Sequence, residues 1–294
     1  MLLDCAGRVL DLSVPRVMGI LNVTPDSFAD GGDFLSFPAA LVRAERLVRD
    51  GADIIDVGGE STRPGAAAVS VDEELRRVIP VIEAITRRFP VVVSVDTSKA
   101  TVMRAAAEAG AGMINDVFAL RRDGAMSAAV ATGLPVCLMH MQGVPGTMQS
   151  SPRYDDVLSD VRRFLLERVR ACQQSGIPRE KLLVDPGFGF GKTLEHNLAL
   201  LSGLDRLAAL GVPLLVGLSR KSMLGAVTGR PVDERMSASV SAALLAVQRG
   251  AAVVRVHDVS ATVDALKVLR AVSEVDVRAA AADSYGGCSE ESGD

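Results

Sequence analysis

The sequence carries little net charge. Its 32 lysine and arginine residues are nearly balanced by 36 aspartate and glutamate residues, which leaves a formal net charge of −4. A chain of this kind has no overall positive field that would recruit nucleic acid or a membrane surface. A phosphate group that binds to this protein must therefore be held by a local cluster of residues.

Cysteines are also few. Cys5, Cys137, Cys172 and Cys288 lie far apart without Cys-x-x-Cys spacing, and no cysteine and histidine cluster has zinc-site spacing. This pattern favours reduced thiols over a disulfide framework. The amino terminus carries an acid, Asp4, where a signal peptide would be positive, and no apolar run reaches the ~18 residues of a membrane span. We therefore expect a cytoplasmic protein.

What the sequence does have is a series of short apolar runs. With 294 residues, 48% of them hydrophobic and 23% charged, the chain is long enough for one large α/β domain. Eight runs are rich in valine, isoleucine and leucine and do not alternate with polar residues, which is typical of parallel strands buried on both faces. The runs cover residues 17–23, 54–57, 91–95, 112–117, 135–139, 181–184, 213–218 and 252–256.

Segments with helical periodicity separate these runs. In residues 40–48 and 157–169 apolar residues recur at intervals of three and four, so each segment has one face that can cover a strand. Glycines follow the helical segments, where helices commonly end in a left-handed conformation. They are Gly51, Gly110, Gly133, Gly176, Gly211 and Gly250. The pattern predicts a (β/α)8 TIM barrel over residues 17–272, ending in a helix at about 260–272, with a doubly wound sheet as the alternative.

The two ends of the chain fall outside the repeating pattern. Residues 1–16 are expected to form a short hairpin, with strands at 2–5 and 9–12 around Ala6 and Gly7, that closes the amino-terminal end of the barrel. Residues 273–294, with Gly286, Gly287 and nearby glutamates, are expected to form a frayed, disordered tail. No domain boundary is expected between these ends.

A polar group lies at the end of each apolar run. In a closed barrel of parallel strands all the carboxyl ends lie on one face, so eight such endings would assemble a single polar site. The endings are Asn22, Asp56, Asp96, Asn115, His140, Asp185, the segment Ser219-Arg220-Lys221, and the pair Arg255 and His257. The loops at 22–32 and 58–65 are long, polar and rich in glycine, which favours lids over that site, with ordinary turns as the alternative.

The residues at these endings form a set of motifs. They are Asn22-Val-Thr-Pro-Asp-Ser-Phe28, Gly58-Gly-Glu-Ser-Thr-Arg-Pro-Gly65, Ser94-Val-Asp-Thr97, Asn115-Asp116, Leu138-Met-His-Met-Gln142, Asp185-Pro-Gly-Phe-Gly-Phe190, Ser219-Arg-Lys221 and Arg255-Val-His-Asp258. In order and position they resemble the motifs of the bacterial dihydropteroate synthases, which are pterin-binding TIM barrels. The resemblance implies condensation of 6-hydroxymethyl-7,8-dihydropterin diphosphate with p-aminobenzoate in folate synthesis, which yields dihydropteroate and pyrophosphate. It also implies a homodimer.

By this resemblance the pterin is bound by Asp96, Asn115 and Asp185. The 2-amino-4-oxo edge of a pterin alternates donors and acceptors, which suits a mixture of carboxylates and an amide. Alone, Asp96 could be a helix N-cap and Asp185 a turn former. The resemblance also places Lys221 on the pterin carbonyl and ring nitrogen, and Ser219 near the carboxylate of p-aminobenzoate. A Schiff base, as in aldolase-like barrels, is the alternative for Lys221.

The diphosphate is assigned to Arg255 and His257. They are two residues apart, so in extended backbone they face the same side, near the strand ends where barrels commonly bind phosphate. His257 could instead be a satisfied buried imidazole, but its neighbour Arg255 would be expensive to bury without an anion. A diphosphate implies Mg²⁺, which takes only one or two protein oxygens. The resemblance assigns Asn22 as the magnesium ligand, with a plain turn residue as the alternative.

We expect a dissociative substitution without a covalent enzyme intermediate. The dihydropterin ring can release electrons toward its exocyclic methylene, so the diphosphate can depart before the arylamine attacks. Arg255, His257 and the metal would stabilise the departing charge, and Asp96 would offset the cationic ring. With Lys221, these are the expected catalytic residues.

Further residues are expected to exclude water and complete the p-aminobenzoate pocket. They are Phe28 and Asp30 on the first lid, Thr62, Arg63 and Pro64 on the second, and Phe190 as an apolar wall. Two rival functions use the same pterin pocket. One is a pterin-binding methyltransferase barrel, which needs no diphosphate site, and the other is a noncatalytic pterin-binding paralogue.

Overall fold

The computed structural model of the chain describes residues 1–24, 37–61, 68–144 and 146–285. Within these ranges parallel strands form a closed barrel in the order β10-β3-β4-β5-β6-β7-β8-β9. The strands are β3 (Arg16–Asn22), β4 (Ile54–Gly58), β5 (Val92–Asp96), β6 (Met113–Asp116), β7 (Val136–Met139), β8 (Leu182–Asp185), β9 (Leu214–Val216) and β10 (Ala251–Val256). Each strand overlaps the apolar run expected for it, so the predicted (β/α)8 barrel is confirmed.

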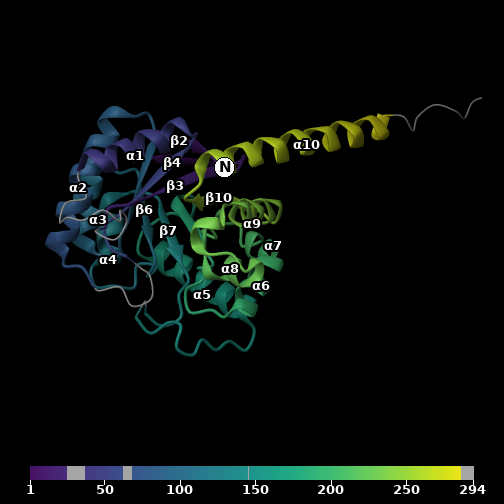
Figure 1. The fold of residues 1–294 in the computed structure, drawn as a ribbon. Coiled ribbons are helices and arrows are strands. Elements are labelled where there is room, and N and C mark those ends of the chain that lie inside the picture. The colour runs from purple at the N-terminus through teal and green to yellow at the C-terminus, as the bar shows by residue number, and fades with distance from the viewer. Residues whose placement is uncertain (25–36, 62–67, 145, 286–294) are drawn as a thin grey trace, which may run out of the picture.

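Helices surround the barrel and connect its strands (Figure 1). They are α1 (Phe37–Arg49), α2 (Val71–Arg88), α3 (Ala100–Glu108), α4 (Ala125–Thr132), α5 (Val157–Gln174), α6 (Leu194–Ser202), α7 (Leu204–Ala208), α8 (Ser222–Thr228), α9 (Met236–Gln248) and α10 (Val259–Tyr285). The six glycines expected at helix ends all have positive φ angles, from 65° at Gly133 to 101° at Gly176. In the described part of the chain, no helix is both long and apolar enough to cross a membrane.

The amino-terminal hairpin closes one end of the barrel, as the sequence predicts. Its strands are β1 (Leu2–Cys5) and β2 (Arg8–Asp11), which pair antiparallel. Leu3, Cys5 and Leu10 are buried in one apolar cluster with one residue from each of the eight barrel strands. The barrel residues are Met18, Ile54, Val92, Met113, Cys137, Leu183, Leu215 and Val253. The hairpin therefore seals the end of the barrel opposite the polar strand ends.

The final helix is longer than expected. The sequence predicts a helix at about 260–272 followed by a tail, whereas α10 begins at Val259 and continues to Tyr285. Residues 279–282 are four alanines, which have the highest helix propensity, and two glycines follow Tyr285. Propensity therefore extends the helix beyond the part that covers the barrel, and in Figure 1 α10 projects away from the barrel. The rest of the expected tail, 286–294, lies outside the described residues.

Candidate active site

The carboxyl ends of the strands bring expected site residues to one mouth of the barrel. Asn22, at the end of β3, is aligned with Gly58 of β4, and Gly58 is aligned with Asp96 of β5. Asp96 is in turn aligned with Asn115 of β6. Gly58 leaves space between its neighbours, because a Cβ atom there would stand 3.6 Å from Asp96 Oδ2 and 3.8 Å from Asn22 Oδ1.

Asp56 lies at the centre of this group. It belongs to β4, and its side chain is fully buried. Asp56 Oδ2 accepts a hydrogen bond from Arg255 Nε at 2.6 Å and another from Asn115 Nδ2 at 3.0 Å. Arg255 Nη2 also donates to Asp96 Oδ2 at 2.8 Å. Asp56 thus fixes the Arg255 guanidinium and the orientation of the Asn115 amide.

The charges in this group depend on one another. Burial raises the pKa of Asp96, while Arg255 opposes that shift and Asp56 adds to it. Burial works against the charged form of Arg255, but Asp56 and Asp96 more than offset it, so the pKa of Arg255 is raised. A guanidinium buried with two carboxylates satisfies the general requirement that buried charges be paired. Arg255 therefore stays ionised inside the site.

Lys221 and Asp185 form a second group. Lys221 Nζ donates to the backbone carbonyl of Phe188 and lies 4.7 Å from the centre of the Phe190 ring. Burial lowers the pKa of Lys221 to about 8, although Asp185 opposes this shift. Burial raises the pKa of Asp185, while Lys221 and, more weakly, Arg255 lower it. Asp185 ends β8 and Arg255 lies near the end of β10 in the same parallel barrel, so both groups lie at one mouth.

Ser219 and His257 form a third group. Ser219 Oγ lies 3.0 Å from His257 Nδ1 and accepts a hydrogen bond from the His257 backbone N–H at 3.1 Å. Since that oxygen already accepts the backbone hydrogen bond, its own proton is free to point at Nδ1. Burial, followed by the charges of Arg255 and Arg220, lowers the pKa of His257 to about 4. The imidazole is therefore neutral at physiological pH, and the tautomer with its proton on Nε2 would let Nδ1 accept from the Ser219 hydroxyl.

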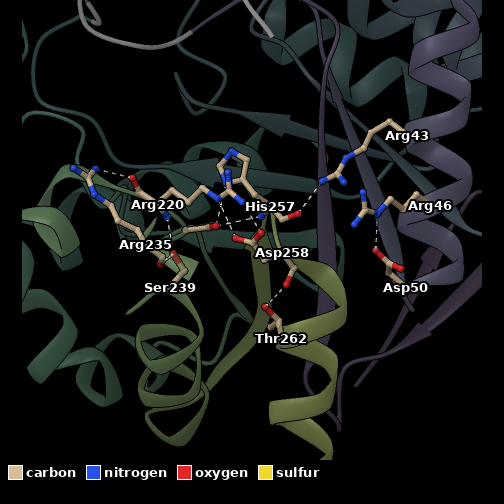
Figure 2. Close-up of polar contacts among 10 residues, drawn as sticks. Arg43, Arg46, Asp50, Arg220, Arg235, Ser239, His257, Asp258 and Thr262 are labelled. Carbon is tan, nitrogen blue, oxygen red and sulfur yellow. Dashed lines mark hydrogen bonds and ion pairs between the residues drawn. The ribbon is translucent and has the colours of Figure 1, made fainter. Parts of the chain in front are cut away.

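Arg220 connects the third group to its surroundings, as Figure 2 shows. Its guanidinium donates to both carboxylate oxygens of Asp258, at 3.0 and 2.6 Å. Its backbone N–H donates to Ser239 Oγ, and its carbonyl accepts from Arg235 Nη1. Arg220 has a φ angle of 58°, which is strained for a residue with a side chain. These contacts hold Arg220 in that conformation, between Ser219 and Lys221.

Phe28 and Asp30 of the first loop, and Thr62, Arg63 and Pro64 of the second, lie outside the described residues.

The sequence left two alternative roles open, a helix N-cap for Asp96 and a turn former for Asp185, and the structure supports only the second. The N-cap of α3 is Lys99, and Asp96 is instead paired with Arg255. Asp185 does form a turn, because its Oδ1 accepts from the Gly187 N–H at 2.7 Å, but burial beside Lys221 is compatible with a second role.

The sequence placed Asp56 and Arg220 among the polar strand ends without indicating a specific role for either, and it did not single out Lys192. The signal for Asp56 was an acidic residue inside an otherwise apolar run, although its partner Arg255 is distant in the sequence. Arg220 stood within a motif, but its positive φ angle depends on contacts with other elements. Nothing in the sequence marks Lys192 as buried.

Comparison with known proteins gives consistent matches. Residues 18–257 match the sequence model of a protein family that is described as pterin binding enzyme. The dihydropteroate synthase of Escherichia coli strain K12 is 56% identical over 271 residues, which cover 92% of this chain and 96% of that protein. A Yersinia pestis dihydropteroate synthase structure with a sulfonamide drug complex has a TM-score of 0.90 and 54% identity, covering 93% of this chain and 100% of the other.

A structure that contains a reaction product is also similar. It is the dihydropteroate synthase of Xanthomonas albilineans in complex with 7,8-dihydropteroate. Its TM-score is 0.86 at 54% identity, and the match covers 93% of this chain and 99% of the other.

Proposed function

We propose a mechanism for this chain from the premise that it belongs to the dihydropteroate synthases of the pterin-binding enzyme family. It condenses 6-hydroxymethyl-7,8-dihydropterin diphosphate with p-aminobenzoate to give 7,8-dihydropteroate and pyrophosphate. The proposal concerns how the residues at the barrel mouth perform this reaction, and its main support is the buried group of Asp56, Asp96, Asn115 and Arg255.

In this mechanism the pterin is held by Asp96, Asn115, Asp185 and Lys221. Asn115 donates to Asp56 through its amide nitrogen, so its oxygen is available to accept from the ligand. Lys221 supplies a donor to the pterin carbonyl and ring nitrogen, and Asp185 supplies acceptors for the amino edge. This set of donors and acceptors matches the alternation along a pterin edge.

The charge of the site favours a cationic pterin. The carboxylates of Asp56 and Asp96 share the single guanidinium of Arg255, so this buried group carries one more carboxylate than cation when all three are ionised. An excess of negative charge in a site shielded from water stabilises positive charge that develops on the ring. We infer that departure of the diphosphate precedes attack by p-aminobenzoate, in a dissociative substitution.

The leaving group is held by Arg255 and His257 in this proposal. His257 is neutral, so it would donate a hydrogen bond from Nε2 to the diphosphate rather than supply a full charge. Arg255 is ionised and supplies the charge. Arg255 lies in β10, which leads into α10. The amino-terminal ends of helices in this part of a barrel commonly bind phosphate.

The residues at the mouth fit Mg²⁺ as a cofactor. Asn22 Oδ1 is a hard oxygen donor, and the missing side chain at Gly58 keeps the space beside it open. Among the described residues no cluster of three or more acidic, histidine or cysteine side chains could hold a metal, which suits an ion that keeps its waters and takes substrate oxygens. A bound Mg²⁺ would neutralise charge on the leaving diphosphate.

The second substrate would attack as a neutral arylamine, so no strong base is required. We infer that Ser219 lies near the carboxylate of p-aminobenzoate and that Phe190 forms an apolar wall. The loops that carry Phe28 and Asp30, and Thr62, Arg63 and Pro64, would exclude water from the cationic intermediate.

A cytoplasmic location and a homodimer complete the proposal. Cys5, Cys137 and Cys172 are free and buried, which suits a reducing compartment. Along α10 the exposed residues Val268 and Val272 are four apart, and Val275 follows at the next turn, so they form an apolar stripe suited to a second copy of the chain.

Pyrophosphate release tests the proposed function. The purified chain is expected to release pyrophosphate at its full rate only when the pterin diphosphate, p-aminobenzoate and Mg²⁺ are all present. A noncatalytic paralogue would bind the pterin without turnover. Methyl transfer from a methylated pterin, in place of pyrophosphate release, would indicate the methyltransferase instead.

A further inference from the structure

Lys192 is a buried lysine that the mechanism does not use. It ends the glycine-rich loop between β8 and α6, and its residue is only 3% exposed. Lys192 Nζ lies 2.9 Å from His140 Nδ1, 2.9 Å from the Gly187 carbonyl oxygen and 3.0 Å from the Phe190 carbonyl oxygen. These acceptors match the donors of an ammonium group. Burial lowers the pKa of Lys192, Asp185 opposes that shift, and the charge of Lys221 adds to it.

The loop held by Lys192 forms the surroundings of Lys221. The carbonyl of Phe188 accepts the hydrogen bond from Lys221 Nζ, and the Phe190 ring lies 4.7 Å from the same atom. Lys192 binds the carbonyls on either side of this segment, at Gly187 and Phe190. The position of Lys221 therefore depends on a backbone segment that Lys192 ties at two points.

The loop requires such a tie because of its glycines. Gly187, Gly189 and Gly191 all have positive φ angles, between 60° and 77°. A Cβ atom at Gly187 would stand 1.9 Å from the His140 carbonyl oxygen, so the backbone packs directly on the segment after β7. Glycine permits this close approach. It loses more backbone entropy on folding than other residues, however, and has no side chain that could hold the loop. Hydrogen bonds from Lys192 supply part of the missing restraint.

His140 provides the third acceptor. It follows β7 and is buried, and its ring packs edge-on against Phe164 with 4.9 Å between the ring centres. Burial, followed by the charges of Lys192 and Arg121, lowers the pKa of His140 to about 2. The neutral ring can present an unprotonated Nδ1 to Lys192 at every physiological pH. The histidine at this strand end therefore faces the loop.

We propose that Lys192 and His140 are positioning residues that fix the β8–α6 loop and thereby place Lys221 and the Phe190 ring for substrate binding. Both would act through the loop backbone. The inference rests on the role of Lys221 given under the proposed function, and it adds a specific restraint on that side chain.

Lys192→Met in the full chain tests the proposal, because methionine keeps most of the length of the side chain and removes the three polar contacts. Amide hydrogen exchange of residues 186–193 is expected to become faster. kcat/KM for the pterin diphosphate is expected to fall about tenfold to a hundredfold, since small displacements of reacting groups have effects of that size. The matched control is Lys181→Met, a lysine on the exposed surface whose Nζ contacts the Gly133 carbonyl.

The pH profile distinguishes positioning from general damage to the fold. The decline of kcat/KM on the alkaline side is expected near pH 8 in the parent chain, where Lys221 loses its proton. In the Lys192→Met variant water reaches Lys221 and a neighbouring positive charge is lost, so the pKa of Lys221 should rise toward the ordinary value and the decline should move to higher pH. His140→Leu keeps that charge, so a shift in the same direction in that variant reports the loop alone. A variant that is merely less stable would lose rate without moving this decline.

Two further variants keep the test decisive. His140→Leu removes one acceptor of Lys192 and is expected to shift exchange and the pH profile in the same direction, so it replaces Lys192→Met if that variant does not fold. Unchanged exchange in residues 186–193, or faster exchange with an unchanged profile and rate, would overturn the proposal. Full activity in Lys221→Ala would instead contradict the role of Lys221 in the proposed function.

Discussion

At the scale of single residues, the buried carboxylate of Asp56 links the charged and polar groups of the site. It holds Arg255 and Asn115 through one oxygen atom, and Arg255 in turn holds Asp96. The strand-end residues are therefore one hydrogen-bonded network, in which removal of one member disturbs the others. This coupling explains why Arg255 can remain inside the site before any anion binds.

Asp56→Asn tests this network. The substitution keeps the shape of the side chain and removes its charge, so it should lower the free energy of unfolding by up to about 3 kcal/mol, because it weakens a buried ion pair. It should also lower kcat/KM by more than about tenfold, a change of roughly 1.4 kcal/mol in transition-state stabilisation. Chemical denaturation and steady-state kinetics measure the two effects. Asp123→Asn, at an exposed position, serves as the control, and equal behaviour of the two variants would refute the assignment.

At the scale of elements, the segment between β9 and α8 is held in place by contacts with later parts of the chain. Arg220 lies in this segment, and its partners Ser239 and Asp258 belong to α9 and to the connection between β10 and α10. Ser219 and Lys221 flank Arg220, so their directions depend on this conformation.

Replacement of Arg220 by glycine and by alanine separates backbone strain from the ion pair. Both variants lose the contact with Asp258, but only glycine adopts the positive φ angle without strain. Arg220→Gly should therefore be more stable than Arg220→Ala by about 1 kcal/mol. At Arg104, an exposed position within α3, the order should reverse, because glycine disfavours helix by about 1 kcal/mol. Thermal melting of the four variants measures both differences, and the same order at both positions would contradict the strain.

Most elements could be predicted from the sequence because buried parallel strands leave continuous apolar runs and polar residues mark their ends. The site residues from Asn22 to His257 were predicted by that rule together with the family motifs. The roles of Asp56 and Lys192 could not be predicted in this way, because both depend on partners that only the folded chain brings near. The length of α10 was underestimated, since Gly286, Gly287 and the nearby glutamates suggested a tail while the alanines at 279–282 favour helix.

At the scale of the whole molecule, α10 carries the exposed apolar stripe that supports a homodimer. Val268, Val272 and Val275 are 66%, 56% and 63% exposed on one helix, and burial of such side chains against another surface is favourable. We expect the chain to be a dimer in solution.

Val268→Glu combined with Val272→Glu should convert the dimer into a monomer, because each substitution would place an unpaired charge in the interface. Light scattering coupled to size-exclusion chromatography measures the mass. Val42→Glu, at a valine of α1 that is 67% exposed, should leave the mass unchanged. A parent chain that is already monomeric, or a double variant that remains dimeric, would show that this stripe is not the interface.

In the proposed mechanism the site stabilises positive charge on the pterin, and an isotope effect tests that proposal most directly. Deuterium at the exocyclic methylene of the pterin diphosphate should lower kcat/KM, because the carbon becomes planar as the diphosphate departs before the arylamine attacks. Asp56→Asn should retain this isotope effect while reacting more slowly. A value at or below one in the parent chain, with chemistry shown to limit the rate, would indicate direct displacement and contradict the dissociative mechanism.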